Sequence, residues 1–132
     1  MNAITKHIAE ILLLIFLAIT FLQSGLDKVF DWKGNLSWLK GHFAKSPLKN
    51  MVPLLLTLVT VFEVAAGLLS AIGIFQLLIN NTRVWGFWGA VISSVSLLML
   101  FFGQRIAKDY EGAKTIAIYL MPAILAVLLL SA

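Results

Sequence analysis

Residues 52–75, VPLLLTLVTVFEVAAGLLSAIGIF, decide the fold of this chain because they are almost wholly apolar and long enough to cross a bilayer. A hydrocarbon core about 30 Å thick needs roughly 20 apolar residues at about 1.5 Å each. The single carboxylate of the stretch, Glu63, lies 11 residues in from Val52, which places it roughly 16 Å deep. An ionisable group there costs at least about 2.5 kcal/mol. The stretch therefore predicts a transmembrane helix whose carboxyl group needs a polar partner from another helix.

The composition of the whole chain agrees with a membrane protein. Of its 132 residues, 61% are hydrophobic and 12% are charged, whereas a soluble protein is nearer half apolar and a quarter charged. We expect one transmembrane domain over residues 1–132. The absence of cysteine excludes disulfides, thiolate metal sites and dithiol redox chemistry in this chain. Its modest net charge of +4 points to lipid headgroups and not to nucleic acid.

Hydropathy predicts an all-α fold, an integral membrane four-helix up-down bundle. Short connections favour antiparallel neighbours, and two of the three connections are short. A signal peptide is the rival interpretation of the first span, but Glu10 is wrong for a basic leader and no small-x-small cleavage pair follows. The expected spans are residues 8–30, 52–77, 83–103 and 113–130.

The segment between the first two spans, DWKGNLSWLKGHFAKSPLKN, is too polar to cross the membrane. Apolar residues recur at helical spacing within it, and tryptophan rings suit the depth of the lipid headgroups. These features predict a short amphipathic helix over about residues 33–45, lying in the interface. A folded cap over the mouth of the bundle is the alternative. The residues expected at the interface are Trp32, Leu36, Trp38, Leu39 and Phe43.

Basic residues predict the orientation of the bundle. Most of them fall in the first and third connections, and only Lys6 and Arg83 lie on the other side. The positive-inside rule then places both termini outside the cytoplasm.

Several polar residues are candidates to meet Glu63. Ser93 matches its depth when residues are counted from Gln104, and Ser94 is within a turn of Ser93. A serine hydroxyl can hydrogen-bond a carboxyl group but cannot neutralise it, whereas lysine or arginine can. The candidate polar centre is therefore Glu63, Lys28, Ser93, Ser94, Gln23 and Arg105.

Small residues predict close packing of the helices. Within residues 52–77, Gly67 and Ser70 share a face with Glu63, and in the third span Gly86, Ala90 and Ser94 repeat every four residues. We find no phosphate-binding loop, no metal-ligand cluster and no nucleophilic triad, so no catalytic or metal-binding residue is assigned. His7 and His42 stand singly in polar flanks, which favours a place at the membrane interface.

Two short motifs resemble a known family. The first span ends in Ser24-Gly25-Leu26-Asp27-Lys28-Val29-Phe30-Asp31, and the second contains Phe62-Glu63-Val64-Ala65-Ala66-Gly67-Leu68-Leu69. This combination of Gly25 and Lys28 with Glu63 and Gly67 resembles the DoxX family of small bacterial membrane proteins. The resemblance implies a four-helix bundle in the bacterial inner membrane with a redox theme, because some relatives are subunits of a thiosulfate:quinone oxidoreductase. Some relatives also place the first connection outside the cytoplasm; our orientation follows the charges instead.

We therefore expect a non-catalytic subunit of a membrane redox complex, which docks other membrane or peripheral redox proteins and helps to form a quinone site. One alternative is a small proton-coupled permease, with Glu63 as its proton site and Lys28 or Arg105 as its gate. Four helices leave little room for a solute path, so the permease would be a homo-oligomer. The other alternative is a membrane scaffold or chaperone that docks partners through the interfacial segment.

Overall fold

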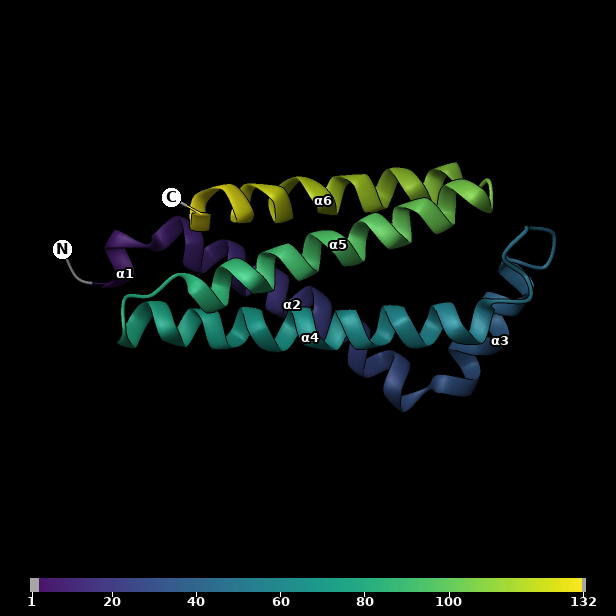
Figure 1. The fold of residues 1–132 in the computed structure, drawn as a ribbon, viewed down its shortest axis with the longest axis horizontal. Coiled ribbons are helices and arrows are strands. Elements are labelled where there is room, and N and C mark those ends of the chain that lie inside the picture. Colours follow the sequence, from purple (N-terminus) through teal and green to yellow (C-terminus); the bar gives the residue numbers. More distant parts are fainter. Residues whose placement is uncertain (1–2, 132) are drawn as a thin grey trace.

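The structure, a computed structural model, describes residues 3–131, and all regular secondary structure in this range is helical (Figure 1). Apolar side chains at helical spacing favour helices throughout, and no strand occurs within this range. The predicted all-α fold is confirmed. The helices are α1 (Ala3–Lys6), α2 (Ile8–Phe30), α3 (Trp32–His42), α4 (Val52–Ile79), α5 (Val84–Ile106) and α6 (Tyr110–Ser131).

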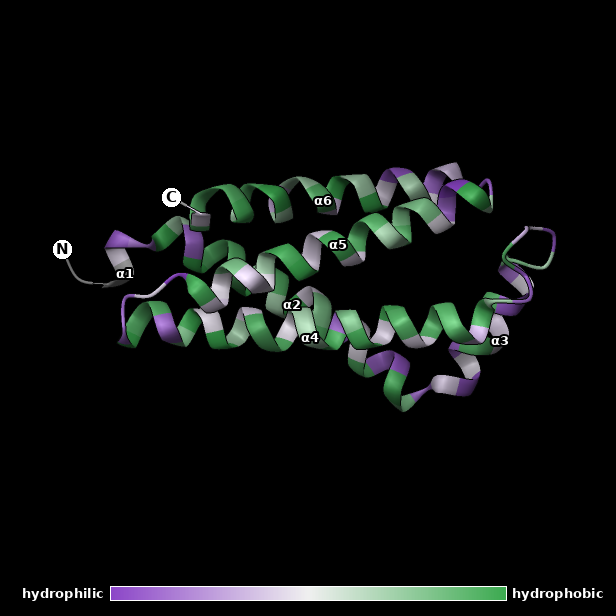
Figure 2. Cartoon of the chain, in the orientation of Figure 1, coloured by the Kyte–Doolittle hydropathy of each residue, from purple (hydrophilic) through white to green (hydrophobic). Residues whose placement is uncertain are grey.

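Four of these helices, α2, α4, α5 and α6, are long and apolar enough to cross a membrane. Figure 2 shows their middles dominated by hydrophobic residues, while hydrophilic residues gather at the two ends of the molecule and on α3. The protein is therefore a multi-pass membrane protein whose outer helix faces contact lipid.

The four long helices run up and down, as predicted. Helix α1 and the end of α6 lie at one end of the bundle together with the α4–α5 turn, and α3 and the α5–α6 loop lie at the other (Figure 1). We call these the terminal end and the lysine-rich end. The short turns need left-handed backbone, which Asn81 (φ 55°) and Lys108 (φ 62°) adopt. The basic residues of the first and third connections thus share one end. These are Lys33, Lys40, Lys45, Lys49, Arg105, Lys108 and Lys114, whereas Lys28, which the sequence places with them, lies within α2.

Three helices are longer than the sequence predicts. Helix α4 continues to Ile79, two residues beyond the expected end of its span. Helix α5 continues to Ile106, three residues beyond the expected end of the span, and α6 begins at Tyr110, three residues before the expected start. Asp109 explains the early start of α6, because its Oδ1 accepts a hydrogen bond of 2.9 Å from the backbone N–H of Gly112. A carboxylate in this position satisfies a free N–H of the first turn.

A single residue, Asp31, separates α2 from α3. Its backbone N–H donates to the carbonyl of Asp27 at 2.9 Å, and its side chain accepts from the N–H of Gly34 at 3.3 Å. Asp31 therefore ends one helix and caps the next, so the chain turns sharply without an intervening loop.

The terminal half of the bundle is tightly closed because glycines line the contact between α4 and α5. A Cβ atom added to Gly73 would lie 2.4 Å from the Cα of Gly86, and one added to Gly89 would lie 2.8 Å from the backbone nitrogen of Ser70. The two backbones touch here, which only small residues permit. The predicted ladder of Gly86, Ala90 and Ser94 is buried, and Gly86 lies at this contact.

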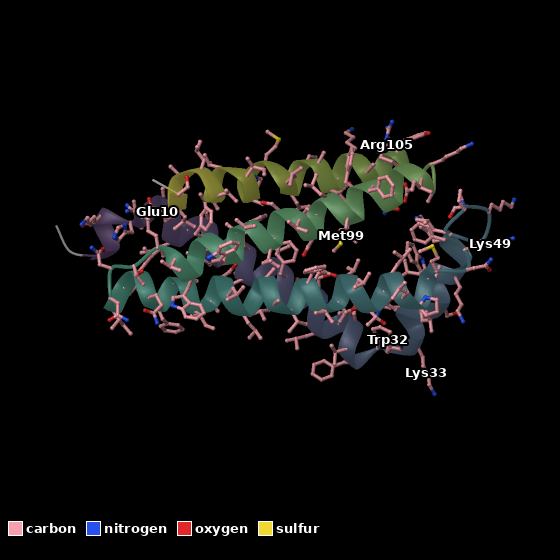
Figure 3. All side chains as sticks on the ribbon, in the orientation of Figure 1. Glu10, Trp32, Lys33, Lys49, Met99 and Arg105 are labelled. Carbon is pink, nitrogen blue, oxygen red and sulfur yellow. The ribbon has the colours of Figure 1, made fainter. Side chains whose placement is uncertain are left out.

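At the lysine-rich end large side chains replace the glycines and the helices separate. A cavity of about 360 Å³ lies there between α4, α5 and α6, with α3 lying over it. Figure 3 shows Met99 pointing from α5 toward α4, into this space. We call it the wedge cavity. Its apolar wall includes Leu55, Leu56, Val59, Met99, Leu100 and Phe102.

The glycine contact yields a prediction about stability. Gly73→Ala adds a methyl group where no space exists, so α4 and α5 must move apart, at a cost of about 1–3 kcal/mol. Unfolding in detergent, followed by circular dichroism, measures this loss. Gly41→Ala in α3 is the matched control, because a Cβ atom there meets nothing within 4 Å. Equal stability of the two variants would contradict backbone contact between α4 and α5.

Candidate functional site

Glu63 meets Lys28 inside the bundle. Lys28 Nζ lies 2.9 Å from Glu63 Oε1, and the two side chains are 17% and 2% exposed, respectively. The contact has the distance of an ion pair, although its angles fall outside those of a hydrogen bond. Lys28 Nζ also donates to Ser24 Oγ at 2.8 Å. Among the alternatives raised by the sequence, a cationic partner for Glu63 is therefore the one that the structure contains.

Two glycines bring the charged residues together. A Cβ atom on Gly25 would lie 2.8 Å from Cγ2 and 3.2 Å from the backbone nitrogen of Val64, and one on Gly67 would lie 2.9 Å from the backbone nitrogen of Leu22. Helices α2 and α4 therefore cross in close contact. Each glycine stands about one turn from a charged residue on its own helix, so the crossing places Lys28 opposite Glu63.

The ion pair borders the wedge cavity, since Lys28 is one of the residues in its wall. Burying two charges costs several kcal/mol for each ion, and mutual attraction offsets this only where the geometry is close. The pair therefore adds little net stability, but the loss of one partner leaves an uncompensated charge. Its position beside a cavity makes it the centre of the candidate site.

The other residues proposed for the polar centre make contacts elsewhere. Ser93 and Ser94 donate to the carbonyls of Gly89 and Ala90 in their own helix, at 2.7 and 2.9 Å. Gln23 is exposed. Arg105 lies over the ring of Tyr110, 4.8 Å from its centroid, and points away from α4 (Figure 3). Ser93 and Ser94 thus match Glu63 in depth, yet their hydroxyls donate to the backbone of their own helix.

The segment after α2 folds over the cavity. Trp38, Leu39 and Phe43 line it, while Trp32 and Leu36 are half-buried. Helix α3 thus has the arrangement of the folded cap, which was the alternative interpretation of this segment. Its depth at the membrane interface remains a prediction.

His42 links this cap to the far side of the cavity, a contact that the sequence did not reveal. Its Nε2 lies 2.8 Å from Gln104 Oε1 and 3.5 Å from Asp109 Oδ2. Trp38 stacks on the imidazole ring, with 4.7 Å between the ring centroids. Because Trp38, His42 and Gln104 all line the cavity, this contact spans its mouth.

A second polar cluster closes the terminal end. His7 is 1% exposed, and its Nδ1 lies 2.8 Å from Glu10 Oε2 while its Nε2 contacts Asn81 Oδ1. Glu10 Oε2 also lies 3.9 Å from Arg83 Nε. The sequence places His7 in a polar flank and does not predict that its side chain is buried. Only the spacing of His7 and Glu10, one helical turn, signals the contact in the sequence.

These observations define a class of protein: a four-helix membrane bundle with a buried lysine–glutamate pair at a glycine-mediated helix crossing. The family model described as DoxX matches residues 11–82. This match covers more than half of the chain and includes both motifs, so the chain belongs to the DoxX family. No curated protein and no solved structure matches the chain at a significant level.

Substitutions at the ion pair test its energetics. Lys28→Met leaves Glu63 buried without a counter-ion, so we expect a loss of about 3 kcal/mol in the free energy of unfolding at neutral pH. The double variant Lys28→Met/Glu63→Leu removes both charges and should return to within about 1 kcal/mol of the native protein. Unfolding in detergent measures both variants. A double variant as unstable as the single one would show that the two residues are not coupled.

Proposed function

We propose that this DoxX-family protein is a non-catalytic subunit of a redox complex in the bacterial inner membrane, and that it holds a quinone in the wedge cavity. The observation that carries the proposal is the cavity itself, with a volume of about 360 Å³, a largely apolar wall and a buried ion pair at its edge. Small-molecule sites are typically 300–1,000 Å³, mostly apolar, with a few polar groups that orient the ligand.

The residues in the wall fit a quinone. A quinone presents an apolar ring with carbonyl oxygens that accept hydrogen bonds, and Lys28 and Gln104 supply N–H donors among apolar side chains. When bound, the quinone supplies the capacity to carry electrons and protons. The protein itself binds and orients the ring and excludes water with α3. It also holds the ion pair of Lys28 and Glu63 beside the ring.

Electrons for such a site come from a partner. This chain contains no cysteine and thus no dithiol of its own, so a cofactor on another membrane or peripheral protein supplies them. The exposed lysines of the lysine-rich end provide a charged surface for docking that partner.

Quinone binding is tested with protein purified in mild detergent, followed by extraction and chromatographic analysis of bound quinone. Val59→Trp fills the cavity and should lower bound quinone at least about tenfold at equal quinone supply. Leu128→Trp is the control, because Leu128 is 65% exposed on α6 and is not among the residues of the cavity wall.

Equal quinone in these two variants, or none in the native protein, would contradict the proposal. Proton flux in proteoliposomes that disappears in Glu63→Gln would instead favour the permease. Recovery of a redox partner that depends on α3 but not on quinone would favour the scaffold.

A further inference from the structure

We propose that the wedge cavity receives its ligand sideways from the bilayer, through an opening between α4 and α5, while α3 seals the aqueous end. The class of ligand is then an amphiphile dissolved in the membrane, with a neutral hydrogen-bonding head and a long apolar tail. The identity of the head as a quinone rests on the proposed function. The route of access rests on the geometry of the cavity alone.

The side of the cavity between α4 and α5 faces lipid. Leu58 of α4 and Phe102 of α5 both line the cavity, yet they are 43% and 63% exposed. Leu58 lies one and a half turns inside α4, roughly 9 Å along the helix from its start, so this exposure falls at the depth of hydrocarbon. Leu58 and Phe102 are thus both wall and surface at this depth, so the cavity opens here to acyl chains.

The aqueous side of the cavity is covered by α3. His42 Nε2 donates to Gln104 Oε1 at 2.8 Å across the mouth. Beside this bond the ring of Phe43 covers Gly103, since a Cβ atom on Gly103 would lie 3.7 Å from Phe43 Cζ. The backbone after α3 is also held, because the N–H of Leu48 donates to Ser46 Oγ at 3.0 Å and Ser46 is buried. Water thus meets a cover closed by side-chain contacts.

Polar and apolar groups divide the cavity along the same axis. Two of its polar residues, Asn35 and His42, belong to α3, Gln104 contacts His42, and Lys28 lies one turn before α3. The opening toward lipid is bordered by Leu58 and Phe102. A bound amphiphile therefore places its head beneath α3 and extends its tail out between α4 and α5. This arrangement does not suit a water-soluble solute, because the polar side of the cavity is covered by α3 and the open side is apolar and faces lipid.

The absence of cysteine makes the route directly measurable. Val59→Cys places the only thiol in the cavity wall, in protein reconstituted into nanodiscs. We expect a maleimide carried on an acyl chain in the bilayer to label it at least about tenfold faster than a charged, membrane-impermeant maleimide. Leu128→Cys on the lipid-facing side of α6 calibrates the two reagents. In addition, His42→Ala should raise the rate of the impermeant reagent, because the bond across the mouth is lost. Faster labelling by the impermeant reagent in the parent variant would overturn lateral access.

A pair of cross-links then tests ligand exchange. A short bifunctional thiol reagent joining Leu58→Cys to Phe102→Cys closes the opening, and the same reagent joining Phe43→Cys to Gly103→Cys fixes the cover. Each cross-linked protein is compared with the same variant before cross-linking. We expect the first cross-link to slow exchange of a long-tailed quinone at least about tenfold and the second to leave it unchanged. The opposite pattern, or equal exchange in both, would overturn the proposal. If the native protein binds no quinone, the proposed function fails, and the labelling rates alone still decide the route of access.

Discussion

One interaction, the ion pair of Lys28 and Glu63, constrains the rest of this molecule. A carboxylate in the middle of an apolar helix has to be compensated, and the nearest route is a helix crossing so tight that a lysine can reach it. Gly25 and Gly67 permit that crossing by leaving room for the facing backbone. The motifs at residues 24–31 and 62–69 thus have a common physical basis, since each helix contributes one charge and the glycine that makes the charge reachable.

The division of the bundle into a closed half and an open half follows from side-chain size. Toward the terminal end Gly73, Gly86 and Gly89 let α4 and α5 touch, and the buried contacts of His7 hold the start of α2 against the α4–α5 turn. Toward the lysine-rich end leucine, methionine and phenylalanine keep the helices apart. Helices that touch at one end and diverge at the other enclose a wedge. The ion pair lies at the edge of that wedge, where the polar and apolar parts of the molecule meet.

The sequence predicts the fold well because hydropathy and loop length determine how many helices cross and in which direction they run. It also predicts that Glu63 needs a partner, and it includes Lys28 among the candidates. Depth along a helix does not determine rotation about its axis, so Ser93 matched Glu63 in depth but bonds to its own backbone. The contact of His42 with Gln104 joins residues 62 positions apart, and that of His7 with Asn81 joins residues 74 apart. No short-range sequence pattern predicts either contact.

The junction at Asp31 has a mechanical consequence. Because no loop separates α2 from α3, any rotation of α3 relative to α2 would be centred on Asp31, a single turn beyond Lys28. A displacement of α3 would therefore move the last turn of α2, which carries the ammonium group of Lys28 that contacts Glu63. A protein bound to the exposed face of α3 would thus change the position of Lys28 relative to Glu63. A ligand in the cavity, which contacts α3 from the other side, would act on the same ion pair.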